Sequence, residues 1–323
     1  NAACRKAAGM TSPASRQKPR ALGQGSHIAM IAPASPANGE RIAAGKRELE
    51  RLGFRLVPQR EMSSQGYFAG SAAERRGEFL DALNDPSIDA LIATRGGYGS
   101  AYLLDEGWPE TLASTKPVVG FSDLTTLQVY LWQLHRWPTF YGPMLAAGLD
   151  AGADTAYGYD SASFRHALTN SSCSWEASLG GETLHAGSAE GILLGGAMTL
   201  LEATLGTPWE IDTAGSILIL EDRGMKPYQV DRMLLHLKHA GKFEGVRAMI
   251  LGDFPECEPP VPNSPSVRDV AKRILAPLHV PVLCGAPVGH TARPMLTLPL
   301  GVPARLTAEG QGTLKILEPT VRP

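Results

Sequence analysis

The stretch "KPVVGFSDLTTLQVYLWQL", residues 116–134, joins a short apolar strand to an apparently amphipathic helix through "GFSD" at 120–123. The serine at this junction, Ser122, has two interpretations. It can cap the helix, because its hydroxyl accepts hydrogen bonds from the free N–H groups of the first turn. It can also be a nucleophile, exposed by a tight strand-to-helix turn with backbone N–H groups beside it. The stretch by itself leaves both interpretations open.

The alternation of strand and helix continues on the N-terminal side of this stretch. The helix predicted at residues 71–85 begins with Ser71 and Glu74 in capping-box spacing. Alternation of this kind favours right-handed crossovers and a parallel sheet with both faces covered. The helix after Asp123 is expected to pack one face against that sheet, because its leucines recur at helical spacing. Those leucines are Leu124, Leu127, Leu131 and Leu134, and the other predicted strands lie within residues 27–35, 54–58, 89–95 and 139–143.

Residues 151–187 interrupt this alternation of strands and helices. They are small, polar and Gly-rich, which is the composition of a linker or loop region. Strand and helix patterns resume afterwards, from "EGILLGG" at 190–196 to the β-rich C-terminal end. We therefore expect two α/β domains, residues 25–150 and 188–323. Residues 1–24 lack apolar periodicity and are expected to form a flexible tail.

The composition excludes several classes of function. The 323 residues are 43% hydrophobic and 19% charged, as in an ordinary soluble globular protein. A formal net charge of -2 offers no excess of positive charge for nucleic acid or an anionic membrane. No apolar run approaches the roughly 18 residues that span a bilayer. The scattered cysteines (Cys4, Cys173, Cys257 and Cys284) include no CxxC pair, which argues against a zinc site or disulfide framework and favours the cytoplasm.

The polar residues that follow the predicted strands contain the groups that acyl transfer by serine requires. Functional sites in open parallel sheets lie outside the carboxyl ends of the strands. A serine nucleophile needs a base, a carboxylate that orients the base, and N–H donors for the developing oxyanion. The residues at these positions are Arg95-Gly96-Gly97, Ser122-Asp123, Glu221-Asp222-Arg223 and Gly289-His290-Thr291.

Each of these features also has a simpler interpretation. Glu221 can be a charge at a strand end, and His290 can be an ordinary loop histidine. The glycine-rich "RGGYGS" at 95–100 resembles a phosphate-binding loop but matches neither GxGxxG nor the Walker spacing. His236 and His239 lie three residues apart on a predicted helix, where an exposed face or a subunit contact is favoured over a metal site. The combination of serine, histidine and carboxylate at strand ends favours hydrolysis.

At these residues the chain resembles the LD-carboxypeptidases, serine peptidases that cleave murein tetrapeptides, and their microcin-immunity relatives. The resemblance extends from about residue 26 to the C-terminal end. It rests on several motifs in the same order along two domains, namely "IAPAS" at 31–35, the stretch 66–100, "GFSD" at 120–123, "LLGGAMTLLEATLGTP" at 193–208, "LEDRG" at 220–224, "DRML" at 231–234, "GHT" at 289–291 and "LPLG" at 298–301.

The resemblance implies an N-terminal Rossmann-like domain, a smaller C-terminal α/β domain and an active site at their interface, usually in a homodimer. It places the nucleophile on Ser122, the glutamate on Glu221 and the histidine on His290. The oxyanion donors fall on the backbone N–H groups of Gly97 and Asp123. No metal or organic cofactor is implied. One departure is residues 197–198, where Ala-Met replaces the Asn-Leu of many relatives, which puts any substrate contact from this position in doubt.

The implied reaction cleaves the bond between an L-configured diamino-acid centre and the terminal D-Ala of murein tetrapeptide during cell-wall recycling. In that reaction His290 accepts the proton of Ser122, and Glu221 orients the imidazole. We therefore expect the Ser122 hydroxyl close to one ring nitrogen of His290 and Glu221 at the other. Arg95 and Arg223 are candidates for the terminal carboxylate by position alone.

Two other functions stay open. The first is an immunity-type peptidase that cleaves aminoacyl–nucleotide conjugates, in which Trp175 or Trp209 would stack on the base. The second is a binding module made of two α/β domains and a cleft, whose serine only contacts the ligand. A binding module gives no reason for a base and a carboxylate at matching strand ends.

Overall fold

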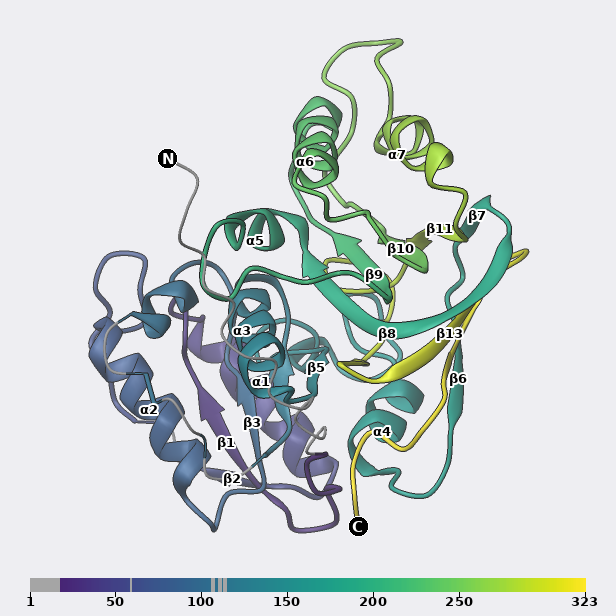
Figure 1. The fold of residues 1–323 in the computed structure, drawn as a ribbon. Helices are drawn as coiled ribbons and strands as arrows, with labels where there is room; N and C mark the ends of the chain where they lie inside the picture. The colour runs from purple at the N-terminus through teal and green to yellow at the C-terminus, as the bar shows by residue number, and fades with distance from the viewer. Residues whose placement is uncertain (1–17, 59, 106–107, 110–111, 113–114) are drawn as a thin grey trace, which may run out of the picture.

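The computed structural model describes residues 18–58, 60–105, 108–109, 112 and 115–323, and these residues form two β-sheets flanked by helices (Figure 1). The first sheet has the strand order β12–β5–β4–β3–β1–β2, in which β12 alone is antiparallel to its neighbour. Its strands are β1 (His27–Ile31), β2 (Arg55–Val57), β3 (Ala90–Ala93), β4 (Val118–Gly120), β5 (Thr139–Tyr141) and β12 (Leu298–Leu300). The parallel order 2-1-3-4-5 is a doubly wound topology, whose ligands bind where the strand order reverses.

The helix predicted at residues 71–85 is present and begins at the predicted cap. Asn38 caps α1 (Gly39–Arg51), and Ser71 forms a full capping box with Glu74 at the start of α2 (Ala72–Asn84). Short 3-10 turns occupy η1 (Ser100–Leu104) and η2 (Ser122–Leu124), and α3 (Thr125–His135) follows η2 directly.

Helix α3 differs from the amphipathic helix that its leucine spacing predicts. Every residue from Thr125 to Trp132 is buried, whereas Leu134 is 50% exposed. The reason is that α3 lies between the two units. Leu127 and Leu131 belong to the core that the two sheets share, and Val129 belongs to the core beneath the C-terminal helices.

The second sheet has the strand order β6–β14–β13–β8–β9–β10–β11–β7, with a parallel centre of β8 to β11 and antiparallel strands on both sides. Its strands are β6 (Trp175–Ser178), β7 (Glu182–His185), β8 (Gly187–Ala197), β9 (Ser216–Glu221), β10 (Ala248–Gly252), β11 (Val282–Ala286), β13 (Pro303–Ala308) and β14 (Thr313–Ile316). The helices from residue 149 onward are η3 (Leu149–Ala151), α4 (Ser161–Thr169), α5 (Met198–Ala203), α6 (Pro227–His239), α7 (Val267–Leu275) and η4 (Ala276–Leu278), of which η3 packs on α1 and α4 on β12 of the first sheet.

The central strand β9 is buried on both faces, which explains its continuous apolar run "ILIL" at 217–220. Ile217 and Ile219 face the core shared with the first sheet, and Leu218 and Leu220 face the core under α6 and α7. Helices α6 and α7 lie beside each other over this second face (Figure 1). The strand therefore holds its last residue, Glu221, rigidly from both sides.

Two parts of the predicted organisation differ in the structure. The predicted linker, residues 151–187, contains α4 and the edge strands β6 and β7. Its polar composition arises because an edge strand such as β6 alternates buried and exposed residues. Within the predicted tail, residues 1–17 lie outside the described residues, but Leu22 is buried and its N–H donates to the Leu168 carbonyl at 2.9 Å.

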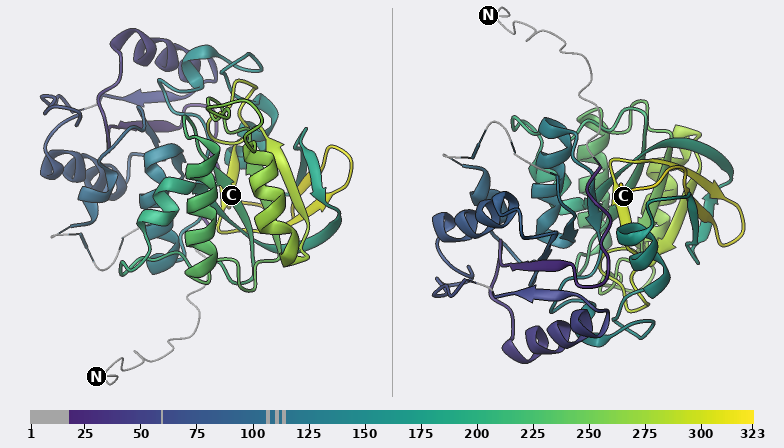
Figure 2. Two further views of the ribbon diagram at one scale, coloured as in Figure 1. Left: turned by 90° about the horizontal axis from the view of Figure 1, so that it is seen from above. Right: turned by 90° about the horizontal axis from the view of Figure 1, so that it is seen from below.

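The two units lie side by side in both views of Figure 2 and share structure at their junction. Strand β12, from the C-terminal part of the chain, pairs with β5 of the first sheet, with Leu298 opposite Tyr141. The first core cluster correspondingly contains residues of both sheets. The carboxyl ends of β4 and β9 are thereby fixed relative to each other. None of the described helices is long and apolar enough to cross a membrane.

Candidate active site

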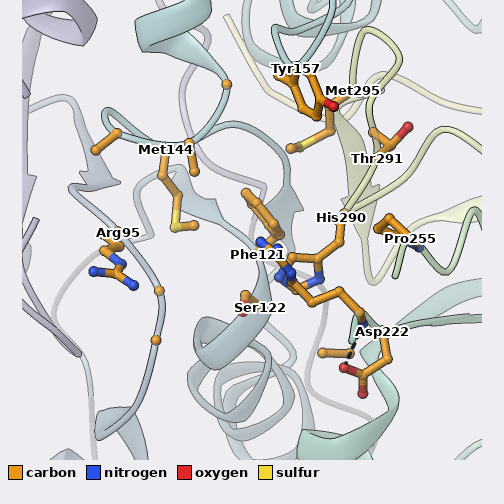
Figure 3. Close-up of a pocket in the computed structure, with 18 of the residues that line it drawn as sticks. Arg95, Phe121, Ser122, Met144, Tyr157, Asp222, Pro255, His290, Thr291 and Met295 are labelled. Atoms are coloured by element: carbon orange, nitrogen blue, oxygen red, sulfur yellow. Dashed lines mark hydrogen bonds between the residues drawn. The ribbon is translucent and has the colours of Figure 1, made fainter. Parts of the chain in front are cut away.

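Ser122 lies at the sharp turn between β4 and α3 with a φ of 64°. A side chain other than glycine rarely adopts this left-handed conformation, which is strained and concentrates at functional sites. Its side chain lines a pocket of about 700 Å³ whose walls come from both units. Neither η2 nor α3 begins with a side-chain cap, so the Ser122 hydroxyl does not cap a helix. The turn instead presents this hydroxyl to the pocket (Figure 3).

The neighbouring Asp123 turns its carboxylate away into the protein. Its Oδ2 accepts a hydrogen bond from the Ser100 N–H at 2.7 Å, and its carbonyl accepts one from the Ser100 hydroxyl at 2.6 Å. Burial raises the pKa of Asp123, against the hydrogen bonds from Ser100. The side chain ties the serine turn to the glycine-rich loop, so that only the backbone of Asp123 is left for an oxyanion.

The glycine-rich loop passes very close to Ser122. A Cβ at Gly96 would lie 3.2 Å from the Ser122 Oγ and 3.4 Å from the backbone N of Asp123. Gly97 has a φ of 108°, and a Cβ there would lie 2.4 Å from the Ser35 Oγ. A side chain at position 96 would therefore crowd Ser122, and one at position 97 would displace the "IAPAS" loop. Because both residues are glycines, the space beside the serine hydroxyl stays open for a substrate carbonyl oxygen.

A buried arginine that the sequence analysis missed holds this loop in place. Arg75 of α2 is 1% exposed, and its Nη1 donates to the carbonyls of Gly99, at 2.8 Å, and Pro33. Its Nε donates to the Gly70 carbonyl at 3.0 Å, and its guanidinium lies 4.9 Å from the centre of the Phe68 ring. Nothing in the sequence indicates which of Arg75 and Arg76 is buried, because both belong to the charged first turns of α2.

Glu221 ends β9, is fully buried and is surrounded by donors. Its Oε2 accepts hydrogen bonds from the backbone N–H and from the Nδ1 of His290, both at 2.9 Å. Its Oε1 accepts one from the Tyr141 hydroxyl at 2.5 Å. A Cβ at Gly289 would lie 2.3 Å from the carboxyl carbon, so the "GHT" motif needs glycine for the loop to approach Glu221.

The contact with Glu221 sets the orientation of His290. Because Nδ1 is engaged, Nε2 is the nitrogen left for a serine hydroxyl, and the Phe121 ring packs edge-on against the imidazole at 5.1 Å. Ser122 and His290 line the same pocket (Figure 3). No hydrogen bond joins the Ser122 hydroxyl to His290 within the described part of the chain, so the predicted serine–histidine contact is not made in this structure.

A second network holds the loop that carries His290. The Thr291 hydroxyl donates to Asp253 Oδ2 at 2.5 Å. Arg293 donates to the same carboxylate through Nε at 3.1 Å and Nη2 at 2.5 Å. Asp253 follows β10, so the loop is fastened to the strand beside β9. The sequence does not predict these contacts, because nothing in it indicates that residues 253 and 293 meet.

The environment of His290 predicts how activity depends on pH. Burial disfavours the imidazolium, but the charge and hydrogen bond of Glu221 outweigh it, so the pKa of His290 lies above its ordinary value. A general base must be neutral, so for the base role that the family resemblance implies for His290, kcat/KM is expected to fall as the pH drops through this raised pKa. A pH–rate profile measured between about pH 5 and 9 checks this, and an acidic limb centred below about 6.5 would contradict it.

The raised pKa of His290 gives folding stability the opposite dependence on pH. Protonated His290 stabilises the folded state fully below its unfolded pKa of about 6.5, and this contribution is lost as the pH rises through the folded pKa.

The two candidate arginines occupy different surroundings in the pocket wall. Arg95 donates from Nη1 to the Pro36 carbonyl at 3.1 Å and has no acidic partner among the described residues. Arg223 forms an ion pair with Glu256. The buried Asp222 between Glu221 and Arg223 accepts from the Thr199 N–H at 2.9 Å and from its hydroxyl at 2.6 Å. Arg95 is thus the candidate with a free charge.

Several other predicted residues lie elsewhere. Trp175 and Trp209 are not among the pocket residues; Trp175 stacks on His166 and Trp209 contacts Tyr130. The exposed aromatic ring at the pocket is Tyr157. No cluster of metal ligands occurs among the described residues, and the Nδ1 of His236 pairs with Glu202 at 2.6 Å.

Ala197, the departure noted above, does line the pocket, where it presents a methyl group. Its neighbour Met198 is fully buried in the core under α6 and α7.

Comparison with known proteins identifies the family. Residues 28–142 match the LD-carboxypeptidase N-terminal domain, and residues 190–306 match the LD-carboxypeptidase C-terminal domain. The chain belongs to the LD-carboxypeptidase family. Its members include carboxypeptidases and an immunity protein, and membership supports a peptidase activity for this chain.

Individual LD-carboxypeptidase relatives cover nearly the whole chain. The probable murein peptide carboxypeptidase of Bacillus subtilis is 34% identical over 90% of this chain and 92% of its own. The structure of muramoyltetrapeptide carboxypeptidase from Oxalobacter formigenes has a TM-score of 0.81 and 29% identity, covering 92% of this chain and all of the other. The wild-type apo structure of the microcin C7 self-immunity protein MccF, a protein of Escherichia coli, has a TM-score of 0.84 and 26% identity, covering 94% and 99%.

Proposed function

We propose that this protein is a serine LD-carboxypeptidase that removes the terminal D-Ala of murein tetrapeptide. The observation that carries the proposal is the buried contact between Glu221 and the Nδ1 of His290, beside a strained serine in the same pocket. That contact fixes the imidazole tautomer in which Nε2 can accept a proton. The murein tetrapeptide carboxypeptidase of Pseudomonas aeruginosa, 32% identical over 82% of this chain, supports the choice of substrate.

In the proposed reaction the Ser122 Oγ attacks the carbonyl carbon of the diamino acid, and its proton passes to the Nε2 of His290. The backbone N–H groups of Gly97 and Asp123 stabilise the oxyanion. The protonated His290, whose charge Glu221 stabilises, then donates this proton to the nitrogen of D-Ala as the peptide bond breaks. Water, deprotonated by the same histidine, hydrolyses the acyl-enzyme and regenerates Ser122.

The direct test is incubation of the full chain with purified murein tetrapeptide and mass spectrometry of the products. We expect free alanine and a tripeptide, and no product from the peptide that ends in L-Ala. A matched incubation of the wild-type chain after its nucleophilic serine has been phosphonylated by a fluorophosphonate, with loss of fluoride, should be inactive. Intact tetrapeptide after prolonged incubation with the untreated chain would overturn the proposal.

We propose that Arg95 binds the terminal carboxylate, because its charge has no acidic partner in the described residues and it faces the same pocket as Ser122 (Figure 3). Arg95→Ala is expected to raise KM roughly 10- to 100-fold, as for the loss of a charged hydrogen bond, with a smaller change in kcat. Arg223→Ala is expected to change KM less, since Arg223 is engaged by Glu256. Steady-state kinetics with the tetrapeptide and its C-terminal amide measures this.

In that experiment the amide lacks the carboxylate charge, so Arg95→Ala should barely change its KM. An equal effect of Arg95→Ala on both substrates would contradict carboxylate binding.

A second candidate substrate is an aminoacyl–nucleotide conjugate. MccF has been solved with aspartyl sulfamoyl adenosine bound. The observation in favour is Tyr157, a residue that lines the pocket, is 68% exposed and is available to stack on a base. Parallel incubation with an aminoacyl-adenylate analogue separates the candidates, because a nucleotide product with no cleavage of tetrapeptide would favour the immunity-type reaction.

We place this activity in the cytoplasm, as part of cell-wall recycling, in a homodimer. The described cysteines (Cys173, Cys257 and Cys284) are free thiols, which supports a reducing compartment. The family resemblance supports the dimer, and sedimentation equilibrium of the purified chain measures it.

A further inference from the structure

Tyr141 is the last residue of β5, in the "TFYGP" segment that the sequence predicts only as a strand end. Its side chain is fully buried, and its ring contacts Phe121 edge-on at 6.2 Å. The strand belongs to the first sheet, whereas Glu221 belongs to the second. A contact between Tyr141 and Glu221 therefore joins the two units.

The Tyr141 hydroxyl contacts two parts of the site at once. It donates to Glu221 Oε1 at 2.5 Å and accepts a hydrogen bond from the Ser122 backbone N–H at 3.4 Å. Burial, together with the charge of Glu221, raises the pKa of Tyr141 well above its ordinary value, so the phenol stays protonated and remains a donor. The carboxylate is consequently held by Tyr141 on one oxygen and by His290 on the other.

We infer that Tyr141 is a positioning residue, which links the carboxylate that orients His290 to the turn that carries Ser122. The inference rests on the proposed serine mechanism. The hydroxyl acts on the turn through a backbone N–H and on His290 through Glu221, without touching the reacting atoms. Its two hydrogen bonds directly connect the carboxyl ends of β4, β5 and β9.

The link has an electrostatic consequence for His290. A hydrogen-bond donor withdraws negative charge from Glu221 and so weakens the field that favours the imidazolium. The other charges acting on His290 are Asp222, which favours protonation, and Arg223, which opposes it. Removing the Tyr141 hydroxyl leaves these two unchanged. It should therefore raise the pH at which His290 loses its proton.

Tyr141→Phe tests the inference by removing one oxygen. We expect kcat to fall roughly 10- to 100-fold, as for one hydrogen bond to a charged group, with KM nearly unchanged. The acidic limb of the kcat/KM profile should move to higher pH. The matched control is Tyr159→Phe, which removes another buried tyrosine hydroxyl that donates to a carboxylate, Glu48, at 2.6 Å, and should leave the profile in place.

An NMR titration of the His290 imidazole in the free protein provides a readout that needs no turnover. Its pKa should rise in Tyr141→Phe and stay constant in Tyr159→Phe. If the wild-type chain does not cleave tetrapeptide, the proposed substrate fails while this titration still tests the link. An unchanged His290 titration and an unchanged profile in a folded Tyr141→Phe variant would overturn the inference.

A second variant covers the case in which Tyr141→Phe does not fold. Incorporation of 3-fluorotyrosine at position 141 keeps the hydroxyl and makes it a stronger donor, because fluorine acidifies the phenol. The His290 titration should then move to lower pH, opposite to the phenylalanine variant. A shift to higher pH, or none, would contradict the proposed link.

Discussion

Ser122→Ala is expected to lower the kcat for murein tetrapeptide by at least about 10⁴-fold while the protein stays folded. The alanine keeps the turn between β4 and α3, whose strained φ of 64° it tolerates no worse than serine. It removes the atom that would form the acyl-enzyme. Single-turnover kinetics with tetrapeptide and a thermal unfolding curve measure the two expectations.

The control for this variant is Ser188→Ala, on β8, whose hydroxyl contacts Thr307 at 3.3 Å on the exposed side of the sheet. It should retain the activity of the wild type. Residual activity of Ser122→Ala above roughly a tenth of that of the wild type would mean that another group is the nucleophile.

Glu221→Gln is expected to lower kcat by about 10³- to 10⁴-fold, as for the loss of an orienting carboxylate in a triad. The amide is nearly isosteric, so it fits between Gly252 and Gly289, where no larger group has room. It carries no charge and a single acceptor oxygen, which cannot serve both Tyr141 and His290. The imidazolium formed in the reaction then lacks its stabilising partner.

The same variant should lower the pKa of His290, because the Glu221 charge that outweighs burial is gone. The measurements are the kcat/KM profile and the NMR titration of His290. Glu190→Gln, which removes a surface ion pair with Arg305, is the matched control and should change neither. A Glu221→Gln variant within a factor of ten of wild-type kcat would show that the carboxylate does not act on the base.

The sequence by itself is sufficient to predict local features of this protein. Ser71 and Glu74 predict a capping box that the structure contains, because such a cap depends on contacts three residues apart. Glu221 and the glycine-rich segment that begins at Arg95 are predicted at strand ends, and the structure places them at the ends of β9 and β3. The resemblance to the LD-carboxypeptidases, carried by short ordered motifs, is confirmed by the two matching domains.

Features that depend on distant parts of the chain were decided by the tertiary structure. The polar segment 151–187 looks like a linker, but contains α4, β6 and β7, since edge strands satisfy their pairing with few apolar residues. Residues 125–132 of α3 are buried on every side because the second unit covers the face that the sequence would leave to solvent. The spacing of leucines within one helix does not indicate that a second unit packs against its other face.

The site shows the same division. Strand-end position placed Glu221 and His290 among the candidates, but only the packing of two sheets brings them to 2.9 Å. Arg75 and Tyr141 escaped sequence analysis, since their roles come from carbonyls and carboxylates that lie far away along the chain. Local sequence determines which backbone conformations and buried faces are favourable within one element. The hydrogen bonds that orient the candidate triad join elements from both halves, so they exist only once the two sheets have packed together.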